Sequence, residues 1–588
     1  MPIHDASSTV SWSRPIASIG RLAARRRASA GWTLALIPFI CLTAIFFVAP
    51  LVDFLERYGF HGDTWRSVLG SSGERSILMR TLVIALEVTL VSGVLAYFYV
   101  AALLRARGVV RALLIFAAVV PFFTSLLVRS YAWIIVLGND GPLRRSLNWI
   151  LGGDRAPQLL YTRTGVLIGM VHVLLPLFVL PLYAVMREIP SDLHRAARTL
   201  GANRVEAYLR VDLPLSAAGA AAGAVLVFIT ALGFFVTPSL LGGFGDTMVA
   251  QLIDQQLQEA VDLNAAGVLA ILLIVAVLLL ILIFRLAYPL ELLFVQRFDA
   301  DNSLRSPRIA ALRFLEGRHR LTVTKALSRL PWTAISTAMA AVTGLYFLLP
   351  LLVVVPVSFS GDSYLHFPSS SYSLRWYRSV IGDGGWRHAA LNSVVTGLLA
   401  TVLVALVGLL LSFALVRARM SSRLKGIVVL TAVLPVVVPV IVLAIATFVW
   451  FLRLHITGST PALAASHALL GLPYLLIVLT AALRDLDPAL ERASRSLGAG
   501  AIATLRLVTL PLLRAAILVG LFFAFLQSWD ELLIARDVTN DSTTTLPVRL
   551  WAGANQEISP ALAVVSTVGL AVTLVLVGAS FLARRKEL

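Results

Sequence analysis

Long uninterrupted apolar stretches constrain this chain more than any other feature. An α-helix needs about 20 residues to cross the apolar core of a bilayer, and apolar runs of that order recur along the whole sequence. Of the 588 residues, 58% are hydrophobic and only 14% are charged, which disfavours a soluble globular protein. We predict an all-α membrane protein with spans at 32–52, 78–104, 109–137, 164–186, 214–241, 264–288, 332–357, 390–416, 427–452, 465–483, 511–535 and 559–583.

The twelve expected spans form two sets of six, separated by a segment of mixed charge with a basic excess. The apolar run after the basic N-terminal tail is too long for a signal peptide, and no small-residue cleavage site follows it. We therefore expect that run to be retained as the first helix. The expected organisation is a cytoplasmic tail at 1–31, a first transmembrane domain at 32–290, a cytoplasmic linker at 291–331 and a second transmembrane domain at 332–588.

Basic residues orient the expected spans. The net charge is +18, and the stretches "RLAARRR" before the first span, "RARGVVR" at 105–111, "RARMSSRLK" at 417–425 and "RRK" near the end all fall on one side. Residues 243–263, on the other side, contain no Lys or Arg. Because Lys and Arg are in excess on the cytoplasmic side of membrane proteins, we expect both termini in the cytoplasm. No soluble stretch is long enough for a nucleic-acid-binding module, so we expect no nucleic-acid partner.

Several kinds of chemistry are excluded by residue counts. Cys41 is the single cysteine, so an intrachain disulfide and a cysteine-based zinc site are impossible. No two histidines lie four residues apart, as the metalloprotease pattern requires. None of the three lysines (Lys325, Lys425 and Lys586) follows a glycine, so the chain has no phosphate-binding G-x-x-x-x-G-K-[ST] loop. We predict no catalytic residue, no metal site and no cofactor in this chain.

A polar stretch occurs twice. "RAARTLGANRVEAYLRVDLP" begins at Arg195 and "RASRSLGAGAIATLRLVTLP" begins at Arg492. The copies align without a gap, so that Gly201 matches Gly498 at a constant offset of 297 residues. A constant offset indicates an internal repeat. The two loops that contain these stretches lie at 187–214 and 484–511.

Each repeated loop has the pattern of a helix, a turn and a second short helix. We expect Ser191 or Asp192 to cap the first helix in one copy, and Asp487-Pro488 to begin it in the other. A glycine in the left-handed conformation would end that helix, and a proline would begin the next span. Polar loops with a helical turn are common in membrane proteins. Two loops in identical register instead favour a twofold role, with each short helix lying in a groove on a partner.

The loops resemble the coupling loop of bacterial ABC importer permeases, whose pattern is E-A-A, three residues, Gly, nine residues and I-x-L-P. Arg195 and Arg492 stand where the pattern has glutamate, and Ser494 replaces its second alanine in the second copy. The other matching positions are Ala196, Ala197, Gly201, Val211, Leu213 and Pro214 in the first copy, and Ala493, Gly498, Val508, Leu510 and Pro511 in the second.

The resemblance implies two six-helix parallel repeats of a type I ABC importer permease, fused in one chain. It further implies that a homodimer of ATPase subunits, carrying ATP and Mg²⁺, docks on the two loops. A periplasmic or lipid-anchored binding protein would deliver the substrate at a bacterial inner membrane. A twelve-helix secondary transporter is the alternative, although it would need ionisable relays inside the membrane in both halves and no partner-binding loops. A membrane-embedded enzyme is a third possibility.

Three further stretches resemble the polyamine-type branch of these permeases. They are "PFFTSLLVRSYAWIIVLGNDG" at 121–141, "LGFFVTPSLLGG" at 232–243 and "SWDELLIARDVTNDSTTTLPVRLW" at 528–551. The resemblance implies spermidine or putrescine as the cargo. Related branches carry ferric ion or aminophosphonates, and both remain alternatives.

Residues 529–531 are the first candidates for the substrate pathway. Asp530 and Glu531 lie in an apolar stretch, where ionised side chains are costly and usually face a cavity or a partner. Trp529 beside them can offer its ring to an organic cation. In the alternative interpretation, these acids lie near the outer interface or pair with Arg536.

Glu87, Phe234 and Phe235 are the remaining pathway candidates. Glu87 lies in the middle of an expected span and either lines the pathway or pairs with Arg129, and we favour the pair. Phe234 and Phe235 are expected to be packing residues that could also form a gate. The Gly219-x-x-x-Gly223 pair predicts close packing between two helices.

Overall fold

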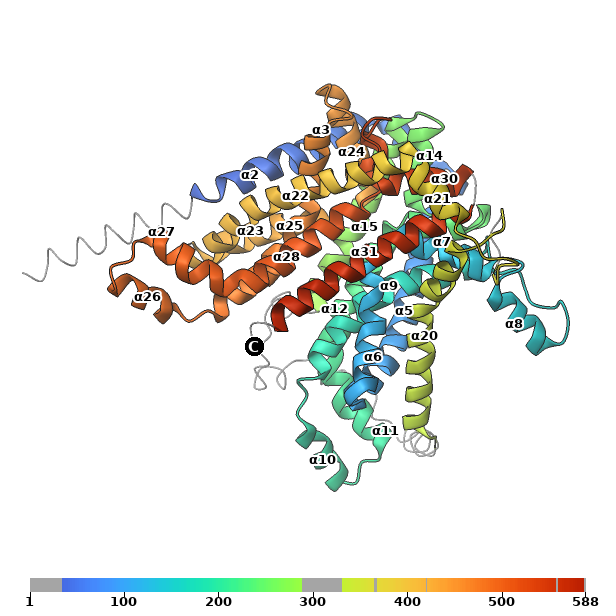
Figure 1. Cartoon of the computed structure of the whole chain (residues 1–588), viewed down its shortest axis with the longest axis horizontal. Helices are drawn as coiled ribbons and strands as arrows, with labels where there is room; N and C mark the ends of the chain where they lie inside the picture. Colours follow the sequence, from blue (N-terminus) through green and yellow to red (C-terminus); the bar gives the residue numbers. More distant parts are fainter. Residues whose placement is uncertain (1–33, 288–329, 364–366, 419, 557–558, 586–588) are drawn as a thin grey trace, which may run out of the picture. The chain divides into compact units, whose positions relative to one another are not determined.

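The computed structural model describes residues 34–287, 330–363, 367–418, 420–556 and 559–585, and all regular elements in these ranges are helices (Figure 1). The expected tail at 1–31 and nearly all of the expected linker at 291–331 lie outside them. The first half contains α2 (Ile37–Thr43), η1 (Ala44–Val48), α3 (Ala49–Tyr58), α4 (Gly62–Gly70), α5 (Ser72–Arg105), α6 (Gly108–Val119), η2 (Val120–Phe123), α7 (Leu126–Leu137), α8 (Pro142–Leu151), α9 (Arg163–Met186), α10 (Ser191–Thr199), α11 (Arg204–Ala207), η3 (Tyr208–Asp212), α12 (Leu213–Leu232), α13 (Val236–Leu241), η4 (Phe244–Asp246), α14 (Val249–Gln258) and α15 (Leu263–Ala287).

The second half repeats much of this order. It contains α20 (Trp332–Ser358), α21 (Arg375–Gly382), α22 (Gly384–Arg417), α23 (Ser422–Val437), α24 (Val440–Arg453), α25 (Thr460–Asp485), α26 (Pro488–Ser496), α27 (Ala501–Thr504), η5 (Leu505–Thr509), α28 (Leu510–Asp530), α29 (Leu533–Val538), α30 (Leu546–Gln556) and α31 (Pro560–Arg585).

The structure confirms a helical membrane protein. Nine helices in the described ranges are long and apolar enough to cross a membrane, and the bent pair α23–α24 makes ten. The shorter apolar helix α6 and the apolar segment Pro560–Val572 of α31 overlap the two remaining expected spans. Each of the twelve expected spans therefore overlaps an apolar helix.

Four expected spans are interrupted, which the apolar pattern did not reveal. The span expected at 109–137 breaks after α6 into the 3₁₀ turn η2, which contains Pro121. The span expected at 427–452 is bent by 94° between α23 and α24, where Pro439 supplies no N–H donor to a helix. The spans expected at 214–241 and 511–535 end early, at Leu232 and Asp530, and a short helix follows each break.

The described residues cluster into two compact units. Unit 1 comprises the described residues up to Pro50, with Asn392–Val436 and Phe451–Glu531. Unit 2 comprises Leu51–Leu391, Val437–Trp450 and the described residues from Leu532 onwards. Each unit thus combines segments from both halves of the sequence.

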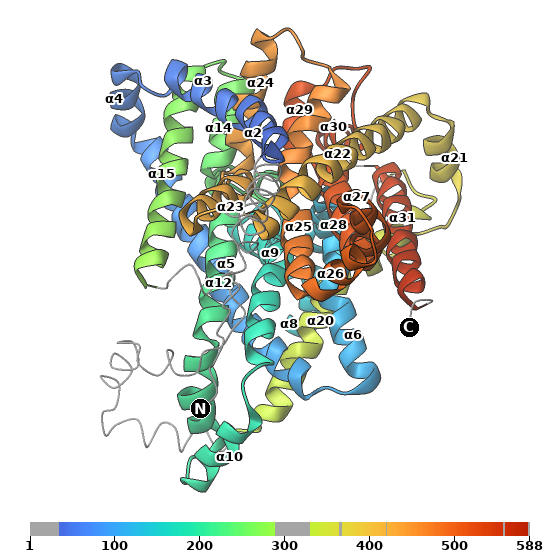
Figure 2. The ribbon, with the colours of Figure 1, turned by 90° about the vertical axis from the view of Figure 1, so that its left-hand side faces the viewer.

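In unit 2, α5, α9 and α12 pack on one another, and α20 of the second half packs on α5, α6 and α7. The α9–α12 contact is close because a Cβ at Gly219 would lie 2.8 Å from the carbonyl oxygen of Pro181, and one at Gly223 would lie 3.0 Å from the Cα of Phe178. The predicted role of this glycine pair in helix packing is confirmed. Figure 2 shows α9 beside α12, with α10 at the foot of α12.

In unit 1, α25 packs along α28, and η1 of the first half packs on α25. Small residues again permit the close approach, since a Cβ at Gly520 would lie 2.8 Å from the Cα of Leu475. Among the described residues, the first helix of each sequence half therefore packs on helices of the other half, α2–η1 in unit 1 and α20 in unit 2.

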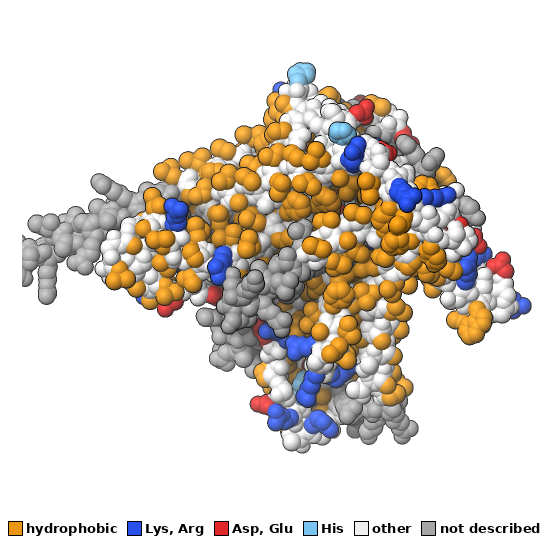
Figure 3. All heavy atoms as spheres, in the orientation of Figure 1, with side chains coloured by type: hydrophobic (Ala, Val, Ile, Leu, Met, Phe, Trp, Pro, Cys, Tyr) orange, Lys and Arg blue, Asp and Glu red, His pale blue; other side chains and the backbone are white. Residues whose placement is uncertain are grey.

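On the face shown in Figure 3, apolar side chains cover much of the surface of the long helices. Large exposed hydrophobic residues such as Leu90 on α5, Ile283 on α15 and Leu406 on α22 would be costly in water and suit contact with lipid tails. Arginines gather instead around α10 and α11, in the polar loop between α9 and α12.

Candidate functional site

The first repeated loop begins with α10. Its N-cap is Pro190, and no side chain bonds the free N–H groups there, so the prediction that Ser191 or Asp192 caps the helix was wrong. The helix begins one residue earlier than a Ser191 cap would place it. Asp192 lies instead in the first turn, where its charge favours the positive end of the helix dipole. In the second loop, the side chain of Asp487 accepts the N–H of Ala489 at 2.8 Å, as a cap should.

Both loops turn at the predicted glycine. Gly201 has φ +87° and Gly498 has φ +91°, which is the left-handed region. The N–H of Gly201 donates to the carbonyl of Arg198, and the next N–H donates to the carbonyl of Ala197. The same two bonds recur in the second loop, at 3.1 and 3.2 Å. These paired bonds define a Schellman cap and fix the chain direction after each first helix.

A wide π-helical turn joins each loop to the membrane helix. The turns η3 and η5 stand at equivalent positions, directly before the membrane helices α12 and α28, whose second residues are Pro214 and Pro511. A proline lacks the N–H donor for the carbonyl four residues earlier, and its ring clashes with that carbonyl. A wider turn accommodates both effects. The prolines were visible in the sequence, but the π turns were not predicted.

Each loop is held against its membrane helix by residues at matching positions. In the first loop, His194 Nε2 lies 2.8 Å from Asp212 Oδ2. In the second, the hydroxyl of Thr509 donates to Glu491 at 3.3 Å, and Arg417 at the end of α22 donates to the same carboxylate at 2.8 Å. We name these two contacts the loop clamps. The clamp residues of the first loop match those of the second at the same offset of 297 residues, but the residue types differ. Residue identity therefore did not predict these contacts.

The outer surface of both loops is alike. Arg195, Ala196, Arg492 and Ala493 are exposed, whereas Ala197 and Ser494 are half-buried. Leucines that sequence reasoning missed stand at the turns, with exposed fractions of 87% for Leu200 and 88% for Leu497. Leu193 and Leu490 are also exposed, about two helical turns earlier. Each loop thus offers two exposed leucines, seven residues apart, beside its arginines.

Glu531 is buried in unit 1 and faces a histidine. It is the cap residue after α28, with extended backbone, and its carboxylate lies 3.1 Å from Nε2 of His467 on α25. The other ring nitrogen of His467 lies 2.8 Å from the hydroxyl of Ser528. The exposed side-chain fractions are 0% for His467 and 3% for Glu531. Trp529 and Asp530, by contrast, are half-buried at the end of α28.

Glu87 pairs with a different arginine from the one expected. Arg163, the first residue of α9, donates to both Glu87 oxygens at 2.7 and 3.0 Å. The expected pair with Arg129 is therefore wrong. Arg163 belongs to a neighbouring helix that packs along α5, a relation that sequence spacing does not reveal.

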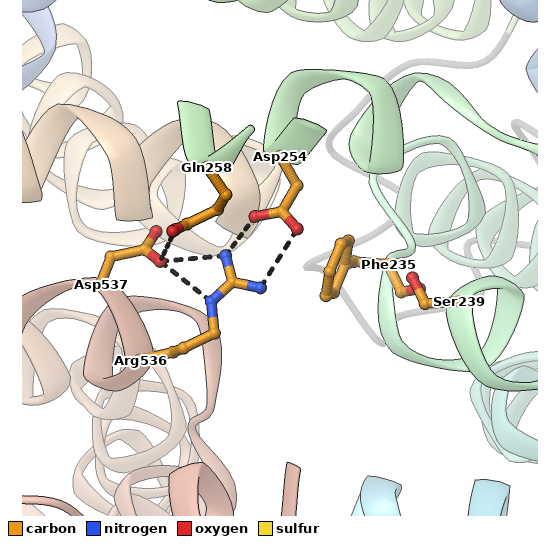
Figure 4. Close-up of polar contacts among 6 residues, drawn as sticks. All are labelled: Phe235, Ser239, Asp254, Gln258, Arg536 and Asp537. Atoms are coloured by element: carbon orange, nitrogen blue, oxygen red, sulfur yellow. Dashed lines mark hydrogen bonds and ion pairs between the residues drawn. The ribbon is translucent and has the colours of Figure 1, made fainter. Parts of the chain in front are cut away.

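Arg536 is held in unit 2 by two carboxylates and an aromatic ring (Figure 4). It donates to both oxygens of Asp254 on α14, and its Nε donates to Asp537 at 3.0 Å. The guanidinium carbon lies 5.2 Å from the centre of the Phe235 ring. Gln258 donates to Asp537 at 3.2 Å. Arg536 was considered only as a partner for Asp530 or Glu531, and Asp254 was missed because its helix is far away in the sequence.

Phe234 and Phe235 are both buried, in the break between α12 and α13. The Phe235 ring packs against Trp551 with centroids 5.3 Å apart. Their expected packing role is thus confirmed, and Phe235 additionally faces a cation.

The repeated loops and the apolar helices agree with a comparison to known families. The model for the binding-protein-dependent transport system inner membrane component matches residues 18–290 and 405–587, which is more than half of the chain. The chain belongs to this family. Its members' domain occurs here twice, so this member carries two permease domains fused in one multi-pass membrane chain.

Curated relatives of this permease are also permeases. The spermidine/putrescine transport system permease protein PotB of Escherichia coli (strain K12) is 36% identical over 180 residues, which is 31% of this chain and 66% of the relative. PotB of Salmonella typhimurium (strain SL1344) is 33% identical over 208 residues, 35% of this chain and 72% of the relative. PotC of Haemophilus influenzae is 27% identical over 244 residues, 41% of this chain and 93% of the relative. The chain spans about two thirds of the length of the first two relatives.

Proposed function

We propose that this chain is the membrane subunit of an ATP-driven importer, with a dimeric ATPase docked on its two loops and a binding protein on the opposite side. The observation that carries the proposal is the matched pair of loops. Both have the same glycine cap, the same π turn and the same exposed leucines. A twofold partner fits two docking elements of the same geometry. The termini and both loops then face the cytoplasm of a bacterial cell.

We propose small organic polycations such as spermidine and putrescine as the cargo. The names of the PotB and PotC relatives support this assignment, as do Asp530 and Glu531 at the end of the broken helix α28. Transporters commonly build substrate sites where membrane helices are discontinuous, and the breaks after α12 and α28 stand at equivalent positions. The chain supplies the pathway, and ATP and Mg²⁺ would bind only to the partner ATPase.

Reconstitution in liposomes tests this function. The chain would be combined with the ATPase and the binding protein of its transport system, and uptake of labelled spermidine would be measured with and without internal or external ATP. We expect uptake that requires all three components and ATP on the ATPase side. Ion-driven uptake by the chain alone would instead support a secondary transporter.

Competition defines the cargo separately. Unlabelled putrescine should reduce spermidine uptake, whereas ferric ion and an aminophosphonate should not. Displacement by either of the latter would refute the polyamine assignment and leave the importer assignment intact.

The exposed leucines provide a further test of docking. Leu200→Asp combined with Leu497→Asp should abolish co-purification of the ATPase, because it places charges on a surface suited to an apolar groove. Leu90→Asp is not a suitable control, because Leu90 faces lipid. Arg378→Asp is the matched control, because it places the same acidic residue at an exposed polar position on α21. Normal co-purification of the double variant would refute docking at these turns.

A further inference from the structure

The Arg536 cluster contains one cation and two anions in a nearly dry setting. The exposed side-chain fractions are 13% for Arg536, 17% for Asp254 and 1% for Asp537. Two carboxylates share one guanidinium here. A buried carboxylate is costly unless a positive group pairs with it, so this site favours cations. Burial also raises the pKa of the Asp254 carboxyl above its ordinary value, against the opposing effect of Arg536.

The cluster has the parts of a site for an organic cation. The Phe235 ring lies beside the guanidinium and is backed by Trp551, so an aromatic wall closes one side. Gln258 donates to Asp537 and fixes the orientation of that carboxylate. In Figure 4 the guanidinium points between Asp254 and the Phe235 ring. Arg536 therefore occupies the position that an ammonium or guanidinium ligand would take.

The two carboxylates are not equivalent. Asp537 is the chain neighbour of Arg536 and moves with α29, whereas Asp254 belongs to α14 in the first half of the sequence. Displacing Arg536 from Asp254 leaves the arginine still bonded to Asp537. Asp254 is thus the carboxylate that can exchange its cation without leaving Arg536 unpaired.

We propose that Asp254 and the Phe235 ring form a binding subsite for an alkylammonium group, and that Arg536 occupies this subsite as an internal competitor when no cargo is bound. The subsite rests on the proposed function for the identity of its cargo. An entering ammonium group takes the place of the guanidinium at Asp254 and beside Phe235. The internal competitor lowers the affinity for cargo and keeps the carboxylates compensated when the site is empty. A site of this kind binds and releases cargo readily.

Equilibrium binding tests the subsite directly. The full chain would be placed in lipid nanodiscs, and the Kd for radiolabelled spermidine would be measured for the wild type, Arg536→Gln and Asp254→Asn. Because Gln cannot compete as a cation, we expect Arg536→Gln to lower the Kd by about three- to tenfold. Removing the exchanged carboxylate should raise the Kd about tenfold in Asp254→Asn, which corresponds to about 1.4 kcal/mol.

Arg549→Gln is the matched control. Arg549 also bonds an aspartate, Asp383, at 3.1 Å, and its guanidinium carbon lies 4.9 Å from the ring centre of Trp386. It lies in the same unit but outside the cluster. The Kd for spermidine should therefore match the wild type in this variant. Equal effects of Arg536→Gln and Arg549→Gln would overturn the proposal.

Folding of each variant would be checked by size-exclusion elution and thermal unfolding. If Arg536→Gln does not fold, Arg536→Lys replaces it, because a point charge holds Asp254 without the paired bonds of the guanidinium. That variant should lower the Kd to an intermediate degree, and an unchanged or raised Kd in the folded variant overturns the proposal.

The failure of this inference differs from the failure of the proposed function. If wild-type chain binds spermidine and Arg536→Gln does not bind it more tightly, the internal competitor is refuted while the cargo assignment stands. If wild-type chain does not bind spermidine but Arg536→Gln does, the cation subsite stands while the cargo assignment loses its support. If neither binds spermidine, the subsite is refuted as well.

Discussion

At the scale of single residues, Glu531 and Asp530 are adjacent in sequence yet occupy different surroundings. The carboxylate of Glu531 is buried against His467, while Asp530 is half-buried at the end of α28. Glu531→Gln removes the carboxylate that faces a fully buried imidazole. We expect it to lower the free energy of unfolding by about 1–3 kcal/mol, measured as a lower midpoint of thermal unfolding in detergent.

Asp530→Asn serves as the neighbouring comparison. Since its side chain is partly accessible, we expect a much smaller change in the unfolding midpoint. The pathway assignment predicts that both substitutions together impair spermidine uptake. Normal uptake by the folded double variant would contradict the role of these acids in transport, and equal midpoints for the two single variants would contradict the structural role of Glu531.

Residue types predicted the candidates better than their partners. An acid inside an apolar run is visible in sequence, and Glu87 and Glu531 were found in that way. Their partners Arg163 and His467 belong to other helices, so that helix packing decides the pairs. Asp254 was missed for a related reason. It lies in a short polar helix, where an ionised side chain is not unusual and does not indicate a functional site.

At the scale of single elements, the glycine turns set the direction of each loop. A Cβ at Gly201 or Gly498 would meet no atom within 4 Å, so alanine there is opposed only by the positive φ. We expect Gly201→Ala and Gly498→Ala each to cost about 1 kcal/mol, and asparagine to cost less. Proline cannot adopt this φ and also removes the N–H that bonds Arg198 or Arg495, so it should uncouple transport.

ATPase co-purification and substrate-stimulated ATP hydrolysis would be measured together for these glycine variants. Gly426→Ala is the control, because that glycine also has open space around it but lies in α23 without a positive φ. Normal coupling in the double proline variant would mean that the turns do not orient the docking helices.

The loop clamps predict local resistance to protease. His194→Ala should free α10 from the base of α12, and Thr509→Ala should weaken the matching contact in the second loop. One lost hydrogen bond of about 1 kcal/mol raises the population of the open loop about fivefold. Tryptic cleavage would be followed by mass spectrometry on the intact chain in nanodiscs. Its rate should rise by a similar factor at Arg195 and Arg198 in His194→Ala, and at Arg492 and Arg495 in Thr509→Ala.

Asp192→Ala provides the contrast for the clamp in the first loop. Its ion pair with Arg195 joins two exposed side chains at 3.3 Å and is expected to contribute little. Cleavage rates that rise equally in Asp192→Ala and His194→Ala would show that the clamp does not restrain α10.

The sequence predicted which elements exist better than where they break. Long apolar runs and the repeated Gly and Pro positions predicted the helices and both loops. The break after α28 has no proline nearby, and the helix ends because Glu531 adopts extended backbone, with ψ 120°. A hydropathy average over the whole apolar run does not reveal a single residue of this kind. A break of this kind depends on tertiary contacts that no local pattern records.

At the scale of the whole molecule, the two sequence halves exchange helices. α20 of the second half packs in unit 2 on helices of the first half, where His172 Nε2 lies 3.2 Å from the carbonyl oxygen of Phe347 and Tyr346 donates to the carbonyl of Ile168. The repeat predicted two sets of six spans, but it carries no information about which set each helix packs against. Only the folded chain distinguishes these arrangements.

This exchange predicts that the chain remains one assembly when its covalent link is cut. Residues 1–305 and 306–588 would be expressed together as separate polypeptides, with an affinity tag on the first. Because the α20 contacts are buried and apolar, as in obligate interfaces, we expect the second fragment to co-purify with the first and most of the spermidine uptake to persist. Tyr346→Ala, which removes a half-buried ring packed against Trp133 and His172, should reduce the amount that co-purifies. Tyr372→Ala is the control, since that ring is exposed. Recovery of the first fragment alone, with both fragments present in the membrane, would mean that the helix exchange does not hold the halves together and that the covalent link does.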